Sequence, residues 1–179
     1  MTAAVRIQPR ASDKAARYAE TAEEIAAVLN GEPNLTARMA TVSAMLADAF
    51  DSFFWTGFYV VDPDRPSELV VGPYQGTLGC LRIAFGRGVC GTAAAKGQTQ
   101  IVADVHAFPG HIACDSASAS ELVVPIVADG LLIGVVDLDS PRTARFDRVD
   151  LDGCTDLARL LAPRLHPGRK AAAGGLKNS

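Results

Sequence analysis

Three cysteines fall in the middle of the chain: Cys80 in "TLGC", Cys90 in "GRGVCG" and Cys114 in "HIACD". Each lies in a loop or at the end of an expected element, beside small residues. An exposed thiol with a lowered pKa is a nucleophile and a redox group. Cys90 precedes the expected "GTAAAKG" helix, whose N-terminal dipole favours a thiolate. The alternative is that all three are small core hydrophobes, because free cysteine is often buried.

Three carboxyl groups follow the last of these cysteines. Asp137 and Asp139 in "DLDS" alternate along an expected strand, so both face the same side of it. Glu121 opens the neighbouring strand, which allows the three acids to converge. Carboxyl groups crowded in a partly apolar pocket have raised pKa values and can act as general acids. For "DLDS" alone, a polar strand end near a turn is the simpler interpretation.

Helical periodicity appears first near the N-terminus and again at the C-terminal end. We expect helices over residues 14–29, with Ala16, Ala19, Ala26 and Leu29 on one face, and over residues 35–50. Asn34 or Thr36 is the candidate cap of the second helix. The pattern also predicts a short helix within 86–98 and an amphipathic closing helix over 146–165. The second helix presents one apolar face, made of Met39, Val42, Leu46 and Ala49.

Strands are expected between the helices. Apolar and β-branched runs at 53–62, 69–76, 80–85 and 99–104 have strand character, and a long loop covers residues 105–120. Residues 121–140 form a hairpin that turns at Asp129-Gly130, a strong hairpin signal. Hairpin-linked strands imply an antiparallel β-sheet flanked by helices, which is an α+β fold.

Composition limits the possible partners and compartments. The 179 residues suggest one domain, and we expect it to span residues 1–166, with a disordered C-terminal tail at 167–179. A net charge of -3 indicates no nucleic-acid or anionic-membrane partner. No apolar run approaches the roughly 20 residues that cross a bilayer, and the N-terminus has no apolar signal core. These features predict a cytoplasmic protein.

The segment that carries the cysteines and acids resembles a known family. "GPYQGTLGCLRIAFGRGVCGTAAAKGQTQIVADVHAFPGHIACDSASASELVVPI", followed by "GVVDLDS", closely resembles the free methionine-(R)-sulfoxide reductases, which have a GAF fold. The resemblance covers about residues 55–147. Few GAF domains carry this cysteine triplet together with "GHIACD" and "DLDS". It implies a GAF-like domain and an enzyme that reduces free methionine (R)-sulfoxide to methionine.

The resemblance also implies a role for each matching residue. Cys114 matches the cysteine that attacks the sulfoxide sulfur, and Cys80 and Cys90 match the partners that resolve the intermediate as a disulfide. Cys154 lies outside the family motif, and we expect it to be a core residue of the closing helix. The acids that match the pocket lining are Glu121, Asp137 and Asp139, and the aromatic residues that match the holders of the methyl end are Trp55 and Tyr59.

The implied reaction passes through a cysteine sulfenic acid and an intramolecular disulfide. A dithiol reductant, expected to be thioredoxin, then restores the thiols. This chemistry requires no metal, flavin or nicotinamide cofactor. The order in which Cys80 and Cys90 act stays open, although Cys80, beside Gly79 at a strand start, is favoured. The resemblance further suggests a homodimer, in which the N-terminal helices supply the contact.

Two other functions compete with the reductase. A GAF module that senses a small ligand without catalysis requires no set of three thiols. A zinc site would combine Cys80, Cys90 and Cys114 with His106 or His111, but neither short-range cysteine pairs nor the usual histidine spacing is present. "GRGVCG" is glycine-rich, yet it lacks the Lys-Ser/Thr ending of a phosphate loop.

Overall fold

The computed structural model describes residues 13–112 and 114–165. The expected domain limits and the tail at 167–179 reach beyond these residues. The elements follow one another as α1 (Lys14–Val28), α2 (Leu35–Ala49), β1 (Trp55–Asp62), β2 (Arg65–Gln75), β3 (Arg82–Ala84), α3 (Gly88–Lys96), β4 (Gln100–Val102), the short 3-10 helix η1 (Val105–Ala107), β5 (Ser120–Ala128), β6 (Leu131–Ser140) and α4 (Arg148–Leu165).

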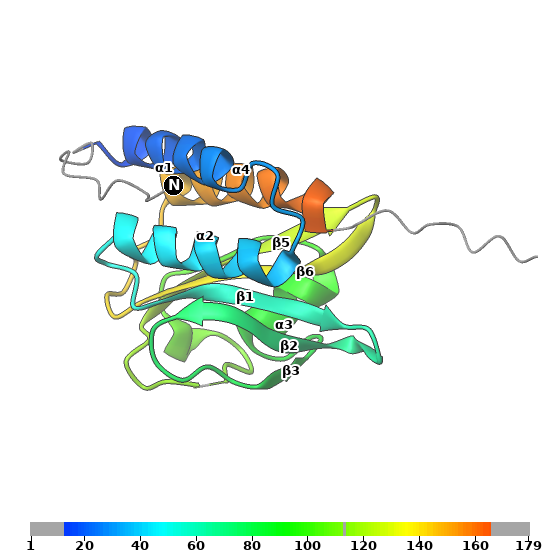
Figure 1. Cartoon of the computed structure of the whole chain (residues 1–179). Coiled ribbons are helices and arrows are strands. Elements are labelled where there is room, and N and C mark those ends of the chain that lie inside the picture. Colours follow the sequence, from blue (N-terminus) through cyan, green and yellow to red (C-terminus); the bar gives the residue numbers. More distant parts are fainter. Residues whose placement is uncertain (1–12, 113, 166–179) are drawn as a thin grey trace, which may run out of the picture.

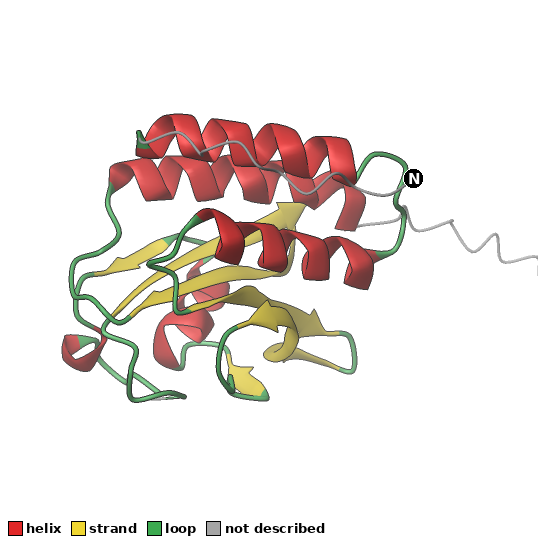
Figure 2. Cartoon of the chain, turned by 60° about the vertical axis from the view of Figure 1, so that its left-hand side comes forward, coloured by secondary structure: helices red, strands yellow, loops and turns green. Residues whose placement is uncertain are grey.

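The strands form one antiparallel sheet in the order β3-β2-β1-β6-β5-β4. The three long helices lie on one face of this sheet and α3 lies on the other (Figures 1 and 2). The hairpin between β5 and β6 turns at Asp129 and Gly130, whose φ angles of 51° and 76° are both positive, as a type I′ turn requires. The predicted α+β architecture is therefore confirmed.

Side-chain caps fix where the first two helices begin. Asp13 accepts a hydrogen bond from the backbone N–H of Ala16 at 2.9 Å, and Asn34 accepts one from that of Ala37 at 2.9 Å. Each bond satisfies a backbone donor that the first helical turn leaves without a partner. Asn34, and not Thr36, is thus the cap of α2.

A hydrophobic core lies on each face of the sheet. The larger core joins α1, α2 and α4 to the sheet, and the four residues predicted for the inner face of α2 are all buried in it. Cys154 is fully buried in the same core, as expected. The smaller core lies under α3 and includes Trp55, Tyr59 and Cys90. The side of the sheet that faces α3 therefore carries the residues that the sequence singled out.

The predicted inner face of α1 is partly wrong. Leu29 is buried as expected, but Ala16 and Ala19 are exposed, whereas Tyr18 and Ile25 are buried. Alanine tolerates either side of a helix, while a large side chain removes more apolar surface from water when it is buried. The large residues therefore set the orientation of α1. Within the described ranges, no helix combines the length and apolar character needed to cross a membrane.

Candidate active site

Cys80 and Cys114 form a disulfide that joins two loops distant in the sequence. Their Cα atoms are 5.3 Å apart, within the usual range for a disulfide. Cys80 lies just before β3, and Cys114 lies in the loop between η1 and β5. The two loops are also joined by a hydrogen bond, in which the hydroxyl of Thr77 donates to Asp115 Oδ2 at 2.7 Å. Cys114 is exposed and also lines a pocket beside the sheet.

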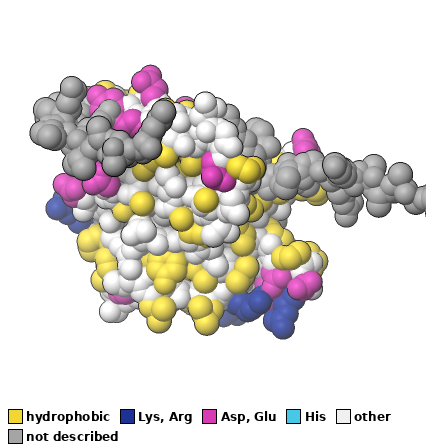
Figure 3. Space-filling view, in the orientation of Figure 1, with side chains coloured by type: hydrophobic (Ala, Val, Ile, Leu, Met, Phe, Trp, Pro, Cys, Tyr) yellow, Lys and Arg dark blue, Asp and Glu magenta, His cyan; other side chains and the backbone are white. Residues whose placement is uncertain are grey.

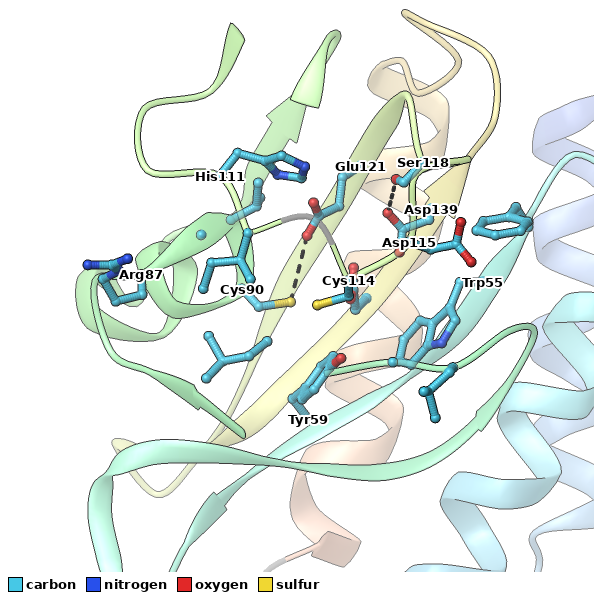
Figure 4. A pocket seen from close by; sticks show the side chains of 18 residues that line it. Trp55, Tyr59, Arg87, Cys90, His111, Cys114, Asp115, Ser118, Glu121 and Asp139 are labelled. Atoms are coloured by element: carbon cyan, nitrogen blue, oxygen red, sulfur yellow. Dashed lines mark hydrogen bonds between the residues drawn. The ribbon is translucent and has the colours of Figure 1, made fainter. Parts of the chain in front are cut away.

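The three predicted acids line this same pocket (Figure 4). Glu121 on β5 faces Asp139 on β6 directly, and Asp137 stands two residues earlier on β6, on the same side of the sheet. The side chain of Ser118 donates a short hydrogen bond to Asp139 Oδ1. Asp137 Oδ1 is buried without a hydrogen-bond partner among the described residues. The strand register thus brings the three carboxyl groups together as predicted.

Burial is the largest cause that raises the pKa of each acid, and neighbouring carboxyl charges add to it. Burial, followed by the charges of Asp137 and Asp139, raises the pKa of Glu121 well above its usual value. Burial and the charge of Asp139 do the same for the pKa of Asp137. Burial raises the pKa of Asp139 to about 6, although the hydrogen bond from Ser118 opposes the rise. The pocket can therefore hold protonated carboxyl groups near neutral pH.

Aromatic side chains from β1 form another wall, and a tyrosine of β2 packs against it. The ring of Trp55 stacks on that of Tyr59, with centroids 5.5 Å apart, and on that of Tyr74, with centroids 5.0 Å apart. Gly57 lies between Trp55 and Tyr59 along β1, and a Cβ atom there would come within 2.3 Å of Tyr74 Cβ. Glycine is therefore needed where the rings approach the strand. Trp55 Nε1 is buried without a hydrogen-bond partner among the described residues.

Cys90 is buried in the same pocket that Cys114 lines (Figure 4). Its Sγ donates a hydrogen bond to Glu121 Oε1 at 3.7 Å. The prediction that the helix dipole favours a thiolate at Cys90 is wrong. Cys90 stands inside the first turn of α3, and burial with the charges of Asp137 and Glu121 raises the pKa of its thiol well above the usual value. Loss of solvation and repulsion by nearby carboxylates outweigh the dipole.

The zinc set considered from the sequence does not assemble here. Cys80 and Cys114 are joined to each other, so neither offers a thiolate to a metal in this state. A different trio lies close: one ligand atom each of Cys90, Glu121 and Asp137 lie within 4.8 Å of one another. All three groups are buried and favour their protonated forms. They therefore suit a polar ligand with hydrogen-bonding groups at least as well as they suit a metal ion.

Sequence reasoning missed several residues of the pocket wall. His111 contributes a buried Nε2 without a hydrogen-bond partner among the described residues, and burial beside His106 lowers its pKa. Ser118 holds Asp139, but nothing in the sequence separates it from the other serines of its loop. Asp115 follows Cys114 directly in "ACD", and this position beside the cysteine could have identified it as a pocket residue. Arg87 adds an exposed side chain at the edge of the pocket.

Comparisons with known proteins agree with this geometry. The GAF domain family matches residues 16–165. The free methionine-R-sulfoxide reductase of Escherichia coli is 44% identical over 144 residues, which cover 80% of this chain and 86% of that protein. The yeast protein of the same name, from Saccharomyces cerevisiae, is 42% identical over 74% of this chain and 76% of its own length.

A solved structure extends the similarity to three dimensions. The free methionine-R-sulfoxide reductase of Neisseria meningitidis, solved in complex with its substrate, superposes with a TM-score of 0.85. It is 49% identical in sequence and covers 90% of this chain and 95% of that one. The range matched by the GAF domain family, residues 16–165, includes the strands and loops that carry the cysteines and acids. The chain belongs to the GAF-domain family and, within it, to the free methionine-(R)-sulfoxide reductases.

Proposed function

We propose that this protein reduces free L-methionine (R)-sulfoxide to L-methionine, with Cys114 as the nucleophile. The observation that carries the proposal is the Cys80–Cys114 disulfide beside a pocket lined by three carboxyl groups. Membership of the reductase family supports the same activity. A module that only senses a ligand remains the second candidate, since GAF domains share this fold, but it leaves both the disulfide and the clustered acids without a use.

The acids activate the sulfoxide. A sulfoxide sulfur is a poor electrophile until its oxygen is protonated or strongly hydrogen-bonded. Glu121, Asp137 and Asp139 have raised pKa values, so the cluster retains protons that it can donate to this oxygen. Buried Cys90 holds Glu121 by a hydrogen bond and favours a defined position of that carboxyl. Activation and attack then take place within one pocket.

The thiols carry the two electrons. Attack of the Cys114 sulfur on the sulfoxide breaks the S–O bond, releases methionine and leaves Cys114 as a sulfenic acid. The thiol of Cys80 condenses with this sulfenic acid, forming the disulfide and releasing water. The observed pairing supports Cys80 as the resolving residue. Cys90 is proposed as a second partner by the family resemblance alone, because its thiol is free and buried. We propose thioredoxin as the dithiol that returns the electrons.

The pocket also suits a free amino acid. The aromatic pair Trp55 and Tyr59 offers an apolar wall for the methyl end of the substrate. The ammonium group suits the acidic cluster, and the substrate carboxylate suits the backbone N–H groups of the glycine- and alanine-rich loop around Cys114. A peptide-bound residue has neither terminal charge. No metal, flavin or nicotinamide takes part in these steps.

We extend the proposal to assembly and location. Residues 1–166 are proposed to form a single domain that acts in the cytoplasm, without a nucleic-acid or membrane partner. A homodimer is proposed through the N-terminal helices. A groove between α1 and α4, lined by small residues such as Ala15, Ala19 and Gly153, supports close helix contacts on that face. Sedimentation equilibrium tests the dimer.

The test of the proposed activity is stereochemical. Racemic free methionine sulfoxide is incubated with the protein and dithiothreitol, and chiral chromatography follows what remains. We expect about half of the sulfoxide to be consumed and the S form to be left. Equal turnover of an N-acylated or peptide-embedded sulfoxide would contradict the free-substrate proposal. Binding without any turnover would favour the sensing module.

A further inference from the structure

The disulfide lies where another protein can reach it. Cys114 is exposed and Cys80 is half-buried. The two loops that carry them are held together at the surface by the hydrogen bond between Thr77 and Asp115. Cys90, by contrast, is buried beneath them. An attacking sulfur that arrives from solvent therefore meets the Cys80–Cys114 bond first.

Two exposed leucines stand on either side of Cys80 in the segment "LGCL". Leu78 and Leu81 are 73% and 72% exposed, more than any other large hydrophobic residue in the described ranges. The remaining exposed ones lie on α1, on β4 and on the β5–β6 hairpin. Figure 3 shows hydrophobic side chains gathered over the lower part of one face, where Figure 1 places β2 and β3. We refer to Leu78 and Leu81 as the leucine rim.

The leucine rim makes no contribution to the core. The loop before β3 presses its backbone against the aromatic wall, because a Cβ atom at Gly79 would lie 3.0 Å from Tyr59 Oη and 3.2 Å from Trp55 Cζ2. The inner side of the loop is therefore already filled, and the leucines face outward. Large apolar side chains that stay exposed next to a reactive bond do not stabilise the fold, and they suit contact with another protein.

The reductant must cover these residues. It supplies two electrons: its thiolate attacks one sulfur of the disulfide, the Cys80–Cys114 bond breaks, and a mixed disulfide forms. Its second thiol then releases both cysteines as thiols and leaves the reductant oxidised. A protein that places a sulfur on this bond comes close to the exposed side chains next to Cys80 in the chain. Transient redox complexes use small interfaces, in which a few buried apolar anchors dominate the affinity.

We infer that the leucine rim is the docking surface for the dithiol protein that reduces the Cys80–Cys114 disulfide. The inference rests on the proposed function, which supplies the need for a protein reductant. It goes further in assigning recognition of that partner to Leu78 and Leu81. A small dithiol needs no docking surface, so the rim matters for the protein reductant and not for dithiothreitol.

The test compares two reductants and two matched variants. Leu78 also borders the pocket, so the variant is Leu81→Glu. Leu131→Glu is the control, because Leu131 is 58% exposed and begins β6 at the end opposite the acids. Turnover of free methionine sulfoxide is measured with dithiothreitol and with increasing thioredoxin. For Leu81→Glu, we expect KM for thioredoxin to rise about tenfold, the effect of losing one interface anchor.

The outcomes separate the inference from the proposed function. Turnover with dithiothreitol should stay within about twofold of wild type in both variants, and Leu131→Glu should leave KM for thioredoxin unchanged. Equal KM values for thioredoxin in the two variants would overturn the inference. Absence of turnover by wild-type protein with dithiothreitol would instead defeat the proposed function. If Leu81→Glu loses turnover with both reductants, Leu81→Ser is measured and judged by the same values.

Discussion

The two faces of the sheet each bury carboxyl groups, and they treat them in opposite ways. On the face covered by α1 and α4, the fully buried Asp150 accepts from Lys14 Nζ at 2.7 Å and from Arg145 Nη1 at 3.1 Å. It also accepts hydrogen bonds from the hydroxyl of Tyr18 and from a backbone N–H. On the face covered by α3, no cation among the described residues forms an ion pair with Glu121 or Asp137, which are also buried.

This difference separates a carboxyl that supports the fold from carboxyls that are kept for chemistry. A buried charge costs free energy unless cations and hydrogen bonds compensate it, as they do at Asp150. Without compensation, burial raises the pKa of a carboxyl and favours its protonated form, as it does for Glu121 and Asp137. An uncompensated acid is destabilising, but it remains available to a substrate. Variants on the two faces should therefore fail in different ways.

The largest effect is expected for the cysteines. Cys114→Ser should abolish methionine release in a single turnover, because a hydroxyl is a far weaker nucleophile toward sulfur than a thiolate. Cys80→Ser should give one near-normal turnover and a slow thioredoxin-coupled cycle. Cys154→Ser, in the core beneath α4, should leave the single-turnover rate and the rate of the thioredoxin-coupled cycle unchanged.

Chromatography of methionine after mixing with excess sulfoxide measures the burst of the first turnover. A full burst from Cys114→Ser, with none from Cys90→Ser, would make Cys90 the nucleophile.

Removing a pocket acid should slow the chemical step without unfolding the protein. Glu121→Gln or Asp139→Asn keeps the side-chain shape but cannot protonate the sulfoxide oxygen. We expect single-turnover rates to fall roughly 10²–10⁴-fold, the range for losing a general acid. Circular dichroism checks that the fold persists. Full activity in both variants would mean that the sulfoxide is activated by other groups.

The sequence predicted the helices, the strands and the convergence of the acids better than it predicted which side chains are buried. Alternation along a strand sufficed to bring Asp137, Asp139 and Glu121 together, because the register of a hairpin is local. The exposure of Cys114 and the burial of Cys90 could not be predicted, since each has a small residue directly beside it in the sequence. Their difference arises from packing between α3 and the loop before β5, which is tertiary. Tertiary packing also decides which face of α1 is buried, which is why the sequence predicted the wrong residues for it.

Removing the charge of Asp150, which pairs with Lys14 and Arg145, should lower the free energy of unfolding without changing the activity. Asp150→Asn keeps some hydrogen bonds but leaves the cations of Lys14 and Arg145 without their buried anion. Removal of one partner of a buried ion pair costs about 3–5 kcal/mol, and we expect about 3 kcal/mol because Lys14 is partly exposed. Asp137→Asn is the matched change on the other face and should leave the free energy of unfolding equal or higher. Urea unfolding measures both. Equal losses in the two variants would remove the distinction between the faces.

The smallest expected effect is a pH dependence that belongs to Asp139. Burial raises its pKa from the usual 3.8 to about 6, so the folded protein binds more protons than the unfolded chain between these values. The contribution of Asp139 to the free energy of unfolding should therefore fall as the pH rises from about 4 to 6, by roughly 2–3 kcal/mol for two pKa units. Asp139→Asn should remove the part of the slope that belongs to this carboxyl, while Glu121 and Asp137, whose pKa values are also raised, keep theirs. Ser118→Ala should raise the pKa of Asp139 further, because the hydrogen bond that lowers it is lost, so stability should continue to fall at higher pH.

Urea unfolding of the oxidised protein at closely spaced pH values gives the slope. An unchanged slope in Asp139→Asn would show that this carboxyl titrates normally, and that the uncompensated cluster is limited to Glu121 and Asp137.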